Sequence, residues 1–436
     1  MAATNVQMAD SRWERLRRYR EYLDFYAGEQ WESPPRPGEK RLTFNYARVF
    51  VHKAASYLFG KPYNLQVPPS DEMPPERAAE VERLLKATYE ANNLYALDYD
   101  TAVDAAVIGD GAFRVLPTEE GVRVTSVDPQ ALDVETDPLD FRRVLAVTHS
   151  YTVEEPVDHG LWAGRRLSGE FVERWTDSEV TLQVDGAHVA TLPNPLGRIP
   201  YVIFPNIRRP FSFWGESDLV DLIGPARELN KRMSVLAWVL EVSGNPIAVL
   251  ENAEADGIRV GPGQLWELPA ESKAYLLDLL QGGGVKLHIE YVDLLYRALH
   301  DIAETPRTAF GDSGRVISGA ALEVEMEPLV QKVSRKRQIW TGVIQARNEL
   351  ILRSLELLGA GPMAPYRTLV QWPSLLPEDR SQTVRDEVAL VEAGIHSRRR
   401  AMEVLGEDDP EAEYRRVVEE YLSPEDISLL QLQHNR

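Results

Sequence analysis

The run Gly311-Asp312-Ser313-Gly314 has the residue types that surround a trypsin-like nucleophile. Such a serine needs a histidine base within hydrogen-bond reach and a carboxylate that orients this base. The run continues with Arg315-Val316 instead of Gly-Pro, and the chain has neither cysteines nor the matching histidine context. We therefore expect a flexible glycine-serine loop here, and a hydrolase acting through Ser313 is the enzymatic alternative.

Three aspartates, Asp98, Asp100 and Asp104, lie close together in the sequence. On a helix Asp100 and Asp104 are one turn apart and could hold a hard metal ion. The simpler interpretation is a solvated acidic face, which we favour. The eight histidines are scattered, and no pair has the HExxH spacing of a metal site.

Phosphate-binding chemistry also lacks its usual signals. There is no GxxxxGK[ST] run, and the triplet Gly282–Gly284 before Val285-Lys286 reads as a hinge. With no constellation for acid–base or nucleophilic chemistry, the sequence predicts that the chain is not an enzyme and that it has no cofactor.

The most uneven charge pattern lies at 323–337. Glu323, Glu325 and Glu327 come before a helix predicted at about 334–358, and Lys332, Arg335 and Lys336 lie around its start. Bases at a helix N-terminus oppose the macrodipole, so a partner should compensate them. Phosphate, acidic groups on a neighbouring subunit and plain solvent all remain open as that partner.

The composition limits the possible functions. The 436-residue chain has 68 acidic and 48 basic side chains, a net charge of −20, so tight generic DNA binding is disfavoured. It has no cysteine, which excludes disulfides and thiolate chemistry. No run approaches 18 apolar residues and the first 20 residues have no apolar core, so we expect neither a membrane span nor a secretory signal.

The elements that position these residues predict an α+β fold that is mainly helical. Apolar periodicity predicts amphipathic helices at 12–31 and 44–60, and further helices at 75–92 and 95–108. Residues 112–206 read as a β-rich region with a hairpin around 113–125. Long helices follow, and about 60 residues at the C-terminal side are again helical.

Two long helices, near 216–244 and 285–305, flank a β-island of about 40 residues at 246–284. The second helix has Leu287, Tyr291, Leu294, Ala298 and Ile302 in register. Such a stalk buries too little of its own apolar stripe, so it should need neighbouring subunits.

Four segments, taken together and in this order, resemble the portal proteins of tailed bacteriophages, the head-to-tail connectors of long-tailed double-stranded DNA phages. They are Tyr22-x-x-Phe25-Tyr26-x-Gly28 with Asn45-Tyr46 and Tyr57-Leu58-Phe59-Gly60-Lys61-Pro62; Pro193-Asn194-Pro195-Leu196-Gly197-x-Ile199-Pro200 with Phe204-x-Asn206 and Gly215-x-Ser217-Asp218; Ser318-Gly319-x-Ala321-Leu322; and Gly394-Ile395-x-Ser397 with Asp408-Asp409-Pro410-Glu411-x-Glu413.

The resemblance implies a ring-forming subunit with wing, stem, clip and crown. The expected parts are a wing at 1–215 including the β-rich part 112–206, stem helix 1 at 216–245, a clip at 246–284, stem helix 2 at 285–306, a loop region with the tunnel loop at 307–333, a long wing helix and linker at 334–377, and a crown at 378–436.

The resemblance also implies a function. The portal would form a ring at one capsid vertex of the virion, twelve subunits there, assembled in the host bacterial cytoplasm with capsid and scaffolding protein. It would conduct double-stranded DNA during packaging and ejection, dock the large terminase and then the head-tail adaptor, and contact no membrane. An acidic tunnel suits this role, because each neutralised phosphate adds affinity and drag. The alternative is another virion ring or adaptor protein that does not conduct DNA.

The residues expected to carry this function fall into three groups. We expect tunnel-loop residues, contacts to DNA or between subunits, and an acidic docking surface on the clip. They are, in that order, Val324, Met326, Pro328, Leu329 and Val330; Lys332, Arg335 and Lys336; and Glu251, Glu254 and Asp256.

Overall fold

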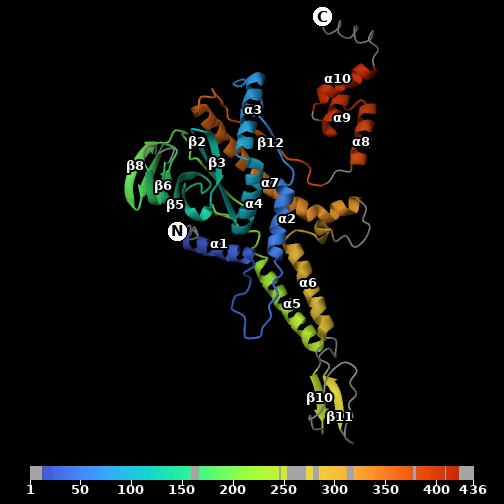
Figure 1. Ribbon diagram of the computed structural model, residues 1–436. Coiled ribbons are helices and arrows are strands. Elements are labelled where there is room, and N and C mark those ends of the chain that lie inside the picture. Colours follow the sequence, from blue (N-terminus) through green and yellow to red (C-terminus); the bar gives the residue numbers. More distant parts are fainter. Residues whose placement is uncertain are drawn as a thin grey trace, which may run out of the picture. The chain divides into compact units, whose positions relative to one another are not determined.

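The computed structural model describes residues 12–158, 166–244, 247–252, 272–277, 284–311, 319–376, 380–407 and 409–421. It has the predicted α+β composition, with long helices and several antiparallel sheets (Figure 1). The chain divides into two compact units, Met1–Pro373 and Ser374–Arg436. Each unit is described by itself.

The described elements follow one another along the chain. The α-helices are α1 (Arg12–Ala27), α2 (Tyr46–Phe59), α3 (Pro75–Ala91), α4 (Leu94–Ile108), α5 (Ile223–Gly244), α6 (Gly284–Ile302), α7 (Gly319–Leu357), α8 (Arg380–Glu392), α9 (Arg398–Val404) and α10 (Pro410–Tyr421). The strands are β1 (Asn64–Gln66), β2 (Asp110–Thr118), β3 (Gly121–Ser126), β4 (Leu132–Thr136), β5 (Val144–Asp158), β6 (Arg166–Trp175), β7 (Glu179–Val184), β8 (Ala187–Pro193), β9 (Tyr201–Pro205), β10 (Ile247–Glu251), β11 (Lys273–Leu277) and β12 (Leu369–Gln371), with 3₁₀ turns at Pro129–Ala131 and Arg307–Phe310.

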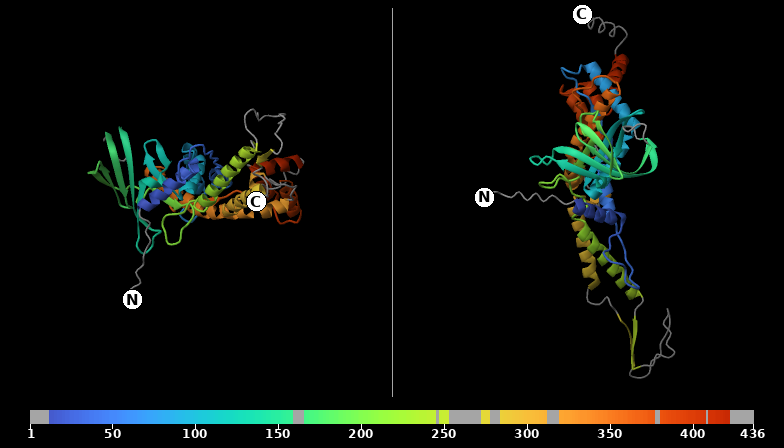
Figure 2. Two further views of the ribbon diagram at one scale, coloured as in Figure 1. Left: turned by 90° about the horizontal axis from the view of Figure 1, so that it is seen from below. Right: turned by 90° about the vertical axis from the view of Figure 1, so that its left-hand side faces the viewer.

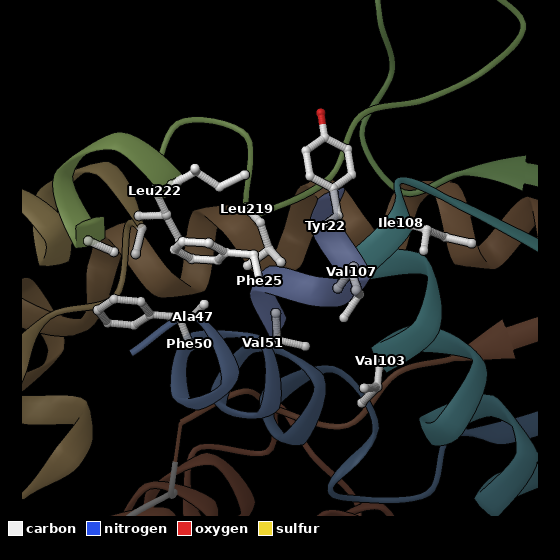
Figure 3. Packing of buried hydrophobic residues seen from close by; sticks show 14 of the residues in the cluster. Tyr22, Phe25, Ala47, Phe50, Val51, Val103, Val107, Ile108, Leu219 and Leu222 are labelled. Atoms are coloured by element: carbon white, nitrogen blue, oxygen red, sulfur yellow. The ribbon is translucent and has the colours of Figure 1, made fainter. Parts of the chain in front are cut away.

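The first helices build one apolar core, as their periodicity predicts. Figure 3 shows side chains of α1, α2 and α4 packing together, among them Phe25, Phe50 and Val107, and all three are buried. Leu219 and Leu222 join them from the segment before α5. The core therefore ties the N-terminal helices to the base of the long helix pair.

Local signals set the ends of these helices. α1 stops before Gly28, whose φ of +106° favours a residue without Cβ. The side chain of Asn45 accepts a hydrogen bond from the Arg48 N–H at 3.2 Å and caps α2. Gly109 ends α4 at φ +105°, and a Cβ there would meet the backbone of Glu216 and Ser217 at 2.9 Å. Only glycine allows this close approach of two chain segments.

The β-rich region forms two antiparallel sheets. One has five strands in the order β4-β5-β6-β7-β8, and the other has three in the order β3-β2-β9. The predicted hairpin is confirmed, with Val115 opposite Val124. Trp175 is fully buried in the core of the larger sheet. A separate two-stranded sheet pairs β1 with β12, and so joins residues about 300 positions apart.

Helices α5 and α6 run side by side and lead to the antiparallel strands β10 and β11 (Figures 1 and 2). The predicted helix–island–helix pattern is therefore present, although residues 253–271 and 278–283 of the island lie outside the described part. One boundary is corrected, because α5 begins at Ile223 and not near 216. Ser217 and Asp218 are instead bonded to the end of α4, where the Asp218 N–H donates to the Ala106 carbonyl at 2.9 Å.

The prediction that 307–333 is a loop region is wrong for 319–333, which belong to the 39-residue helix α7. Pro328 lies inside this helix, where it removes one intrahelical hydrogen bond at the carbonyl of Val324. Val324 and Pro328 are both exposed, so water can solvate this site. The turn at Arg307–Phe310 fits the prediction, and residues 312–318 lie outside the described part.

The second compact unit is helical in its described part, and it includes the segment expected to be the crown. The Ser397 side chain caps α9 by accepting from the Arg400 N–H at 3.2 Å. An ion pair of 3.0 Å between Arg399 and Glu411 joins α9 to α10. Among the described helices of the whole chain, none is long and apolar enough to cross a membrane.

Candidate functional site

The basic residues singled out in the sequence lie where three segments meet. These are residues 216–221 before α5, the C-terminal end of α6 and the middle of α7, and residues 206–208 after β9 join them as a fourth segment. They border a pocket of about 670 Å³, whose lining includes Asp218, Lys332, Arg335 and Lys336. The chain thus brings the candidate contact residues to the base of the long helix pair, where α5 begins and α6 ends.

Asp218 is the centre of this cluster, which we call the Asp218 junction (Asp218, Lys332 and Lys336). The Lys336 ammonium donates to Asp218 Oδ1 at 2.9 Å, and the Lys332 ammonium lies 3.5 Å from Oδ2. The Asn206 amide also donates to Oδ1, at 2.9 Å. Both lysines are buried, with 7% and 6% of their surface exposed.

Opposing effects set the charge state of the junction. Burial alone would raise the pKa of Asp218, but Lys332 and Lys336 outweigh it and hold the pKa well below the usual range. Burial lowers the pKa of Lys336 against the attraction of Asp218. Lys332 also donates to the Ala303 carbonyl at 3.0 Å, next to the C-terminus of α6, where a cation complements the macrodipole.

Arg335 lies at the rim of the same pocket and differs from the two lysines. Its side chain is 56% exposed, and it contacts both carboxylate oxygens of Glu304 at 2.6 Å. Lys332, Arg335 and Lys336 therefore each have a carboxylate partner within the subunit. Lys332 and Lys336 are buried and border the pocket, whereas the Arg335 side chain is exposed.

The five candidate tunnel residues lie on one helical stretch but not on one face. Val324 is 75% exposed and Pro328 is also exposed, whereas Met326 and Leu329 are buried and Val330 is half-buried. The neighbouring Glu323, Glu325 and Glu327 are exposed. The surface of this stretch is therefore acidic with two apolar side chains.

Only one of the three candidate clip residues can be placed. Glu251 is exposed at the end of β10, opposite Lys273 of β11, and it accepts a hydrogen bond from the Tyr275 hydroxyl at 3.3 Å. Glu254 and Asp256 lie outside the described residues.

The residues with enzymatic patterns gain no support. Asp98 is neither on a solvated acidic face, as we favoured, nor beside other metal ligands. It is fully buried and forms a two-oxygen ion pair with Arg347 of α7. No group of three acidic or histidine residues in the described part could hold a metal ion, and Ser313 lies outside that part.

Sequence reasoning missed two buried polar networks. In one, Arg347 joins Asp98 to the hydroxyls of Tyr63 and Tyr89, at 3.2 and 3.0 Å. In the other, Asp110 accepts from the Tyr19 hydroxyl and from the Gly215 N–H. Most of the hydrogen-bonded residues in these two networks are 91 or more positions apart in the sequence, so no local pattern could reveal these pairs. The exceptions are the bonds of Tyr63 to Tyr89 and to Asp98.

Comparison with known proteins places the chain in a family. A family described as "Phage portal protein, SPP1 Gp6-like" matches residues 7–421, nearly the whole length. No curated protein matches the chain. Phage portal proteins are structural, non-enzymatic virion components, and the family implies an oligomeric ring at a capsid vertex that interacts with capsid, terminase and DNA. The chain belongs to the phage portal protein family of the SPP1 Gp6-like type.

Proposed function

We propose that this chain forms a closed ring at one capsid vertex and conducts double-stranded DNA during genome packaging and ejection. The ring has twelve subunits in the virion, assembles with capsid and scaffolding protein in the host bacterial cytoplasm, docks the large terminase and later binds the head-tail adaptor. The observation that carries this proposal is the family match over residues 7–421. The exposed apolar residues of α5 and α6 also support it, because a subunit that acted alone would leave them in water.

The ring is tested by native mass spectrometry and electron microscopy of the purified protein. Twelve copies of a 49.2 kDa chain weigh about 590 kDa, and class averages should show an open centre. DNA conduction needs a channel of roughly 20 Å or more, wider than either groove of B-DNA. A ring with a narrower channel would favour the adaptor alternative, and a stable dimer without rings would contradict the proposal.

The tunnel segment is proposed at the N-terminal part of α7 around Val324, Met326, Pro328, Leu329 and Val330. Of these, Val324 and Pro328 are exposed in the subunit and Val330 is half-buried. The exposed Glu323, Glu325 and Glu327 repel phosphates at short range, which keeps the duplex mobile in the channel. This explains why an acidic protein suits a DNA conduit.

Among the three bases of α7, Arg335 is the one we propose to contact DNA phosphates transiently. Lys332 and Lys336 are committed to Asp218 inside the subunit. An Arg335→Glu variant should assemble into normal rings and package less DNA, measured as nuclease-protected DNA per capsid. Loss of the rings would instead indicate that Arg335 contacts a neighbouring subunit. Arg399→Glu in the second unit serves as the control, since Arg399 is likewise exposed and paired with a glutamate.

The acidic clip surface, Glu251 with Glu254 and Asp256, is proposed to dock the terminase. Neutralising all three with Gln and Asn should weaken binding of purified large terminase without breaking the ring. A control that neutralises the exposed Asp71, Glu119 and Glu120 should leave binding unchanged. Equal terminase affinity of both triple variants would refute this docking surface.

A further inference from the structure

Helix α6 has two apolar surfaces in the described subunit. One is a stripe of exposed side chains, Leu287, Tyr291, Leu294 and Ile302, which are 68%, 38%, 55% and 43% exposed. Burying them would remove a large apolar area from water, and this is the main favourable contribution to most protein association. The stripe is therefore a candidate contact surface.

The other surface is an apolar pocket of about 220 Å³ between α6, α5 and the start of α2. It is lined by Tyr46, Met233, Ile289, Val292 and Tyr296 among others, and it borders Asp293, whose carboxylate pairs with Arg297 at 2.8 Å. An apolar cavity of about 150 Å³ can hold a benzene ring. This pocket therefore has room for one large apolar side chain.

The two surfaces point in opposite directions from the helix. Successive α-helical residues turn by about 100°. On this geometry the four stripe residues fall within an arc of roughly 80°, and Ile289 of the pocket lies roughly 180° from the centre of that arc. A subunit with two different apolar surfaces on opposite sides of one helix suits head-to-tail contacts.

We propose that the stripe of one subunit packs against the pocket of the next subunit in the ring. This proposal rests on the proposed ring and adds which faces of α6 meet. The occupant is a second copy because a heterologous interface that closes into a ring needs two unlike, complementary surfaces, and one helix supplies both.

Charges at the borders of the two surfaces agree with this pairing. On the helical wheel, the exposed Asp301 lies at one edge of the stripe. The Arg307 guanidinium lies 5.2 Å from the Tyr296 ring centroid, beside the pocket. Contact between subunits brings Asp301 of one copy toward Arg307 of the other, which favours the correct face. The other acids near the two surfaces have partners in their own helix, since Glu290 pairs with Lys286 and Asp293 pairs with Arg297.

A rotation about the ring axis leaves heights along that axis unchanged. For a helix that runs along the axis, residues from the same turns of α6 therefore meet. At a rise of 1.5 Å per residue, Tyr291 of the stripe lies about 3 Å in height from Ile289 of the pocket, and Leu294 lies about 3 Å from Tyr296. Tyr291 should therefore approach Ile289 of the neighbour, and Leu294 should approach Tyr296.

Cysteine crosslinking tests this contact, because the chain has no cysteine of its own. We expect oxidised rings of the Ile289→Cys/Tyr291→Cys variant to give a ladder of covalent oligomers on a denaturing gel. Within one chain these two positions point to opposite sides of α6, so their Cβ vectors diverge and no disulfide can join them. Each single variant, and the control Ile289→Cys/Leu139→Cys with the 98% exposed Leu139, should stay monomeric on the gel.

Each contrary result identifies what has failed. Rings without a ladder, or dimers of Tyr291→Cys alone, overturn the proposed pairing of faces and leave the ring intact. If the unchanged protein forms no rings under any assembly condition, the proposed function fails instead.

A second pair of variants does not depend on oxidation. Leu294→Glu places a charge in the proposed contact and should abolish the rings while the monomer keeps its thermal unfolding temperature. Leu139→Glu introduces the same side chain at an exposed leucine away from α6 and should assemble normally. Normal rings of Leu294→Glu would overturn the proposal.

Discussion

Two buried aspartates lie at the short segment that precedes α5, yet their charges are controlled in opposite ways: Asp218 belongs to this segment, and Asp110 accepts from its Gly215 N–H. Asp110 accepts hydrogen bonds from the Tyr19 hydroxyl and, at 2.7 Å, from the Gly215 N–H. These hydrogen bonds lower the pKa of Asp110, and the positive charges of nearby arginines lower it less. Burial outweighs them all and raises the pKa of Asp110 to about 6. Asp218 is equally buried, but two lysine ammonium groups keep its pKa well below the usual range.

The difference shows what holds a charge inside this subunit. Hydrogen bonds from two neutral donors do not compensate the loss of water around Asp110, whereas two adjacent ammonium groups do so for Asp218. The lysines of α7 thus have a structural role that their sequence pattern did not reveal. They connect α7 to the segment before α5 and to the end of α6, so the long helix pair and α7 are joined at one charged point.

The largest effect is expected from Asp218→Asn. This change leaves two buried ammonium groups without their counter-charge, and removal of one partner from a buried pair costs about 3–5 kcal/mol. Urea denaturation at pH 7 should show the loss as a lower midpoint. The matched control is Asp221→Asn, at an exposed position of the same pocket, which should leave the midpoint nearly unchanged.

A double variant sharpens this test. Asp218→Asn/Lys336→Met removes one of the uncompensated ammonium groups and should recover part of the lost stability. If Asp218→Asn unfolds at the wild-type urea concentration, the junction does not stabilise the subunit.

The next effect is a pH dependence that comes from Asp110. As the pH rises from about 4 to about 6, this carboxyl ionises in the unfolded chain while the folded chain keeps its proton. The free energy of unfolding should therefore fall over this range, by roughly 3 kcal/mol in total, and stay lower above it. Asp110→Asn should lack this fall, which melting temperatures at pH 4.5 and 7 would measure.

Asp218 should make the free energy of unfolding depend on pH in the opposite direction. Because its folded pKa is lowered, its contribution to stability is complete above its unfolded pKa, about 4, and is lost as the pH falls below it. Asp218→Asn should therefore flatten the acid limb of the stability curve, whereas Asp110→Asn flattens the limb between pH 4 and 6. An unchanged slope in either variant would contradict the assigned charge state of that aspartate.

A smaller effect is expected from Lys332→Met. Asp218 keeps Lys336 at 2.9 Å, but the Ala303 carbonyl loses its donor and Asp218 loses one of its two cations. A buried hydrogen bond to a charged group contributes about 1.5–3 kcal/mol, and the buried methionine returns some of this through packing. Urea midpoints should place this variant between wild type and Asp218→Asn. A loss as large as that of Asp218→Asn would show that one lysine alone cannot hold the carboxylate ionised.

Local features of the fold follow well from the sequence. Apolar spacing locates α1 and α2, alternation locates the β2–β3 hairpin, and the three- and four-residue steps from Leu287 to Ile302 predict the stripe of α6. These features depend on residues within a few turns or across one tight turn, where periodicity is informative.

What the sequence could not show depends on contacts across long separations. Lys336 and Asp218 are 118 positions apart, and Arg347 and Asp98 are 249 apart. A basic residue near a helix start looks the same whether it faces a phosphate or a buried carboxylate. The helical state of 319–333 was missed for a related reason, because Pro328 is a helix breaker by propensity and is tolerated only through its exposed position.

The smallest effect on stability is expected from Arg335→Ala, although Arg335 has the shortest ion pair of this region, 2.6 Å to Glu304. Both side chains are substantially exposed, so water competes with the pair, and such surface pairs contribute about 0–1 kcal/mol. The urea midpoint should therefore move little. Asp218→Asn, which changes a buried residue of the same pocket, should instead lower it strongly. If Arg335→Ala also packages less DNA than wild type while rings and midpoint are preserved, the exposed base acts on DNA and the buried bases act on the fold. A midpoint shift as large as that of Lys332→Met would instead place Arg335 in the same structural unit as the Asp218 junction.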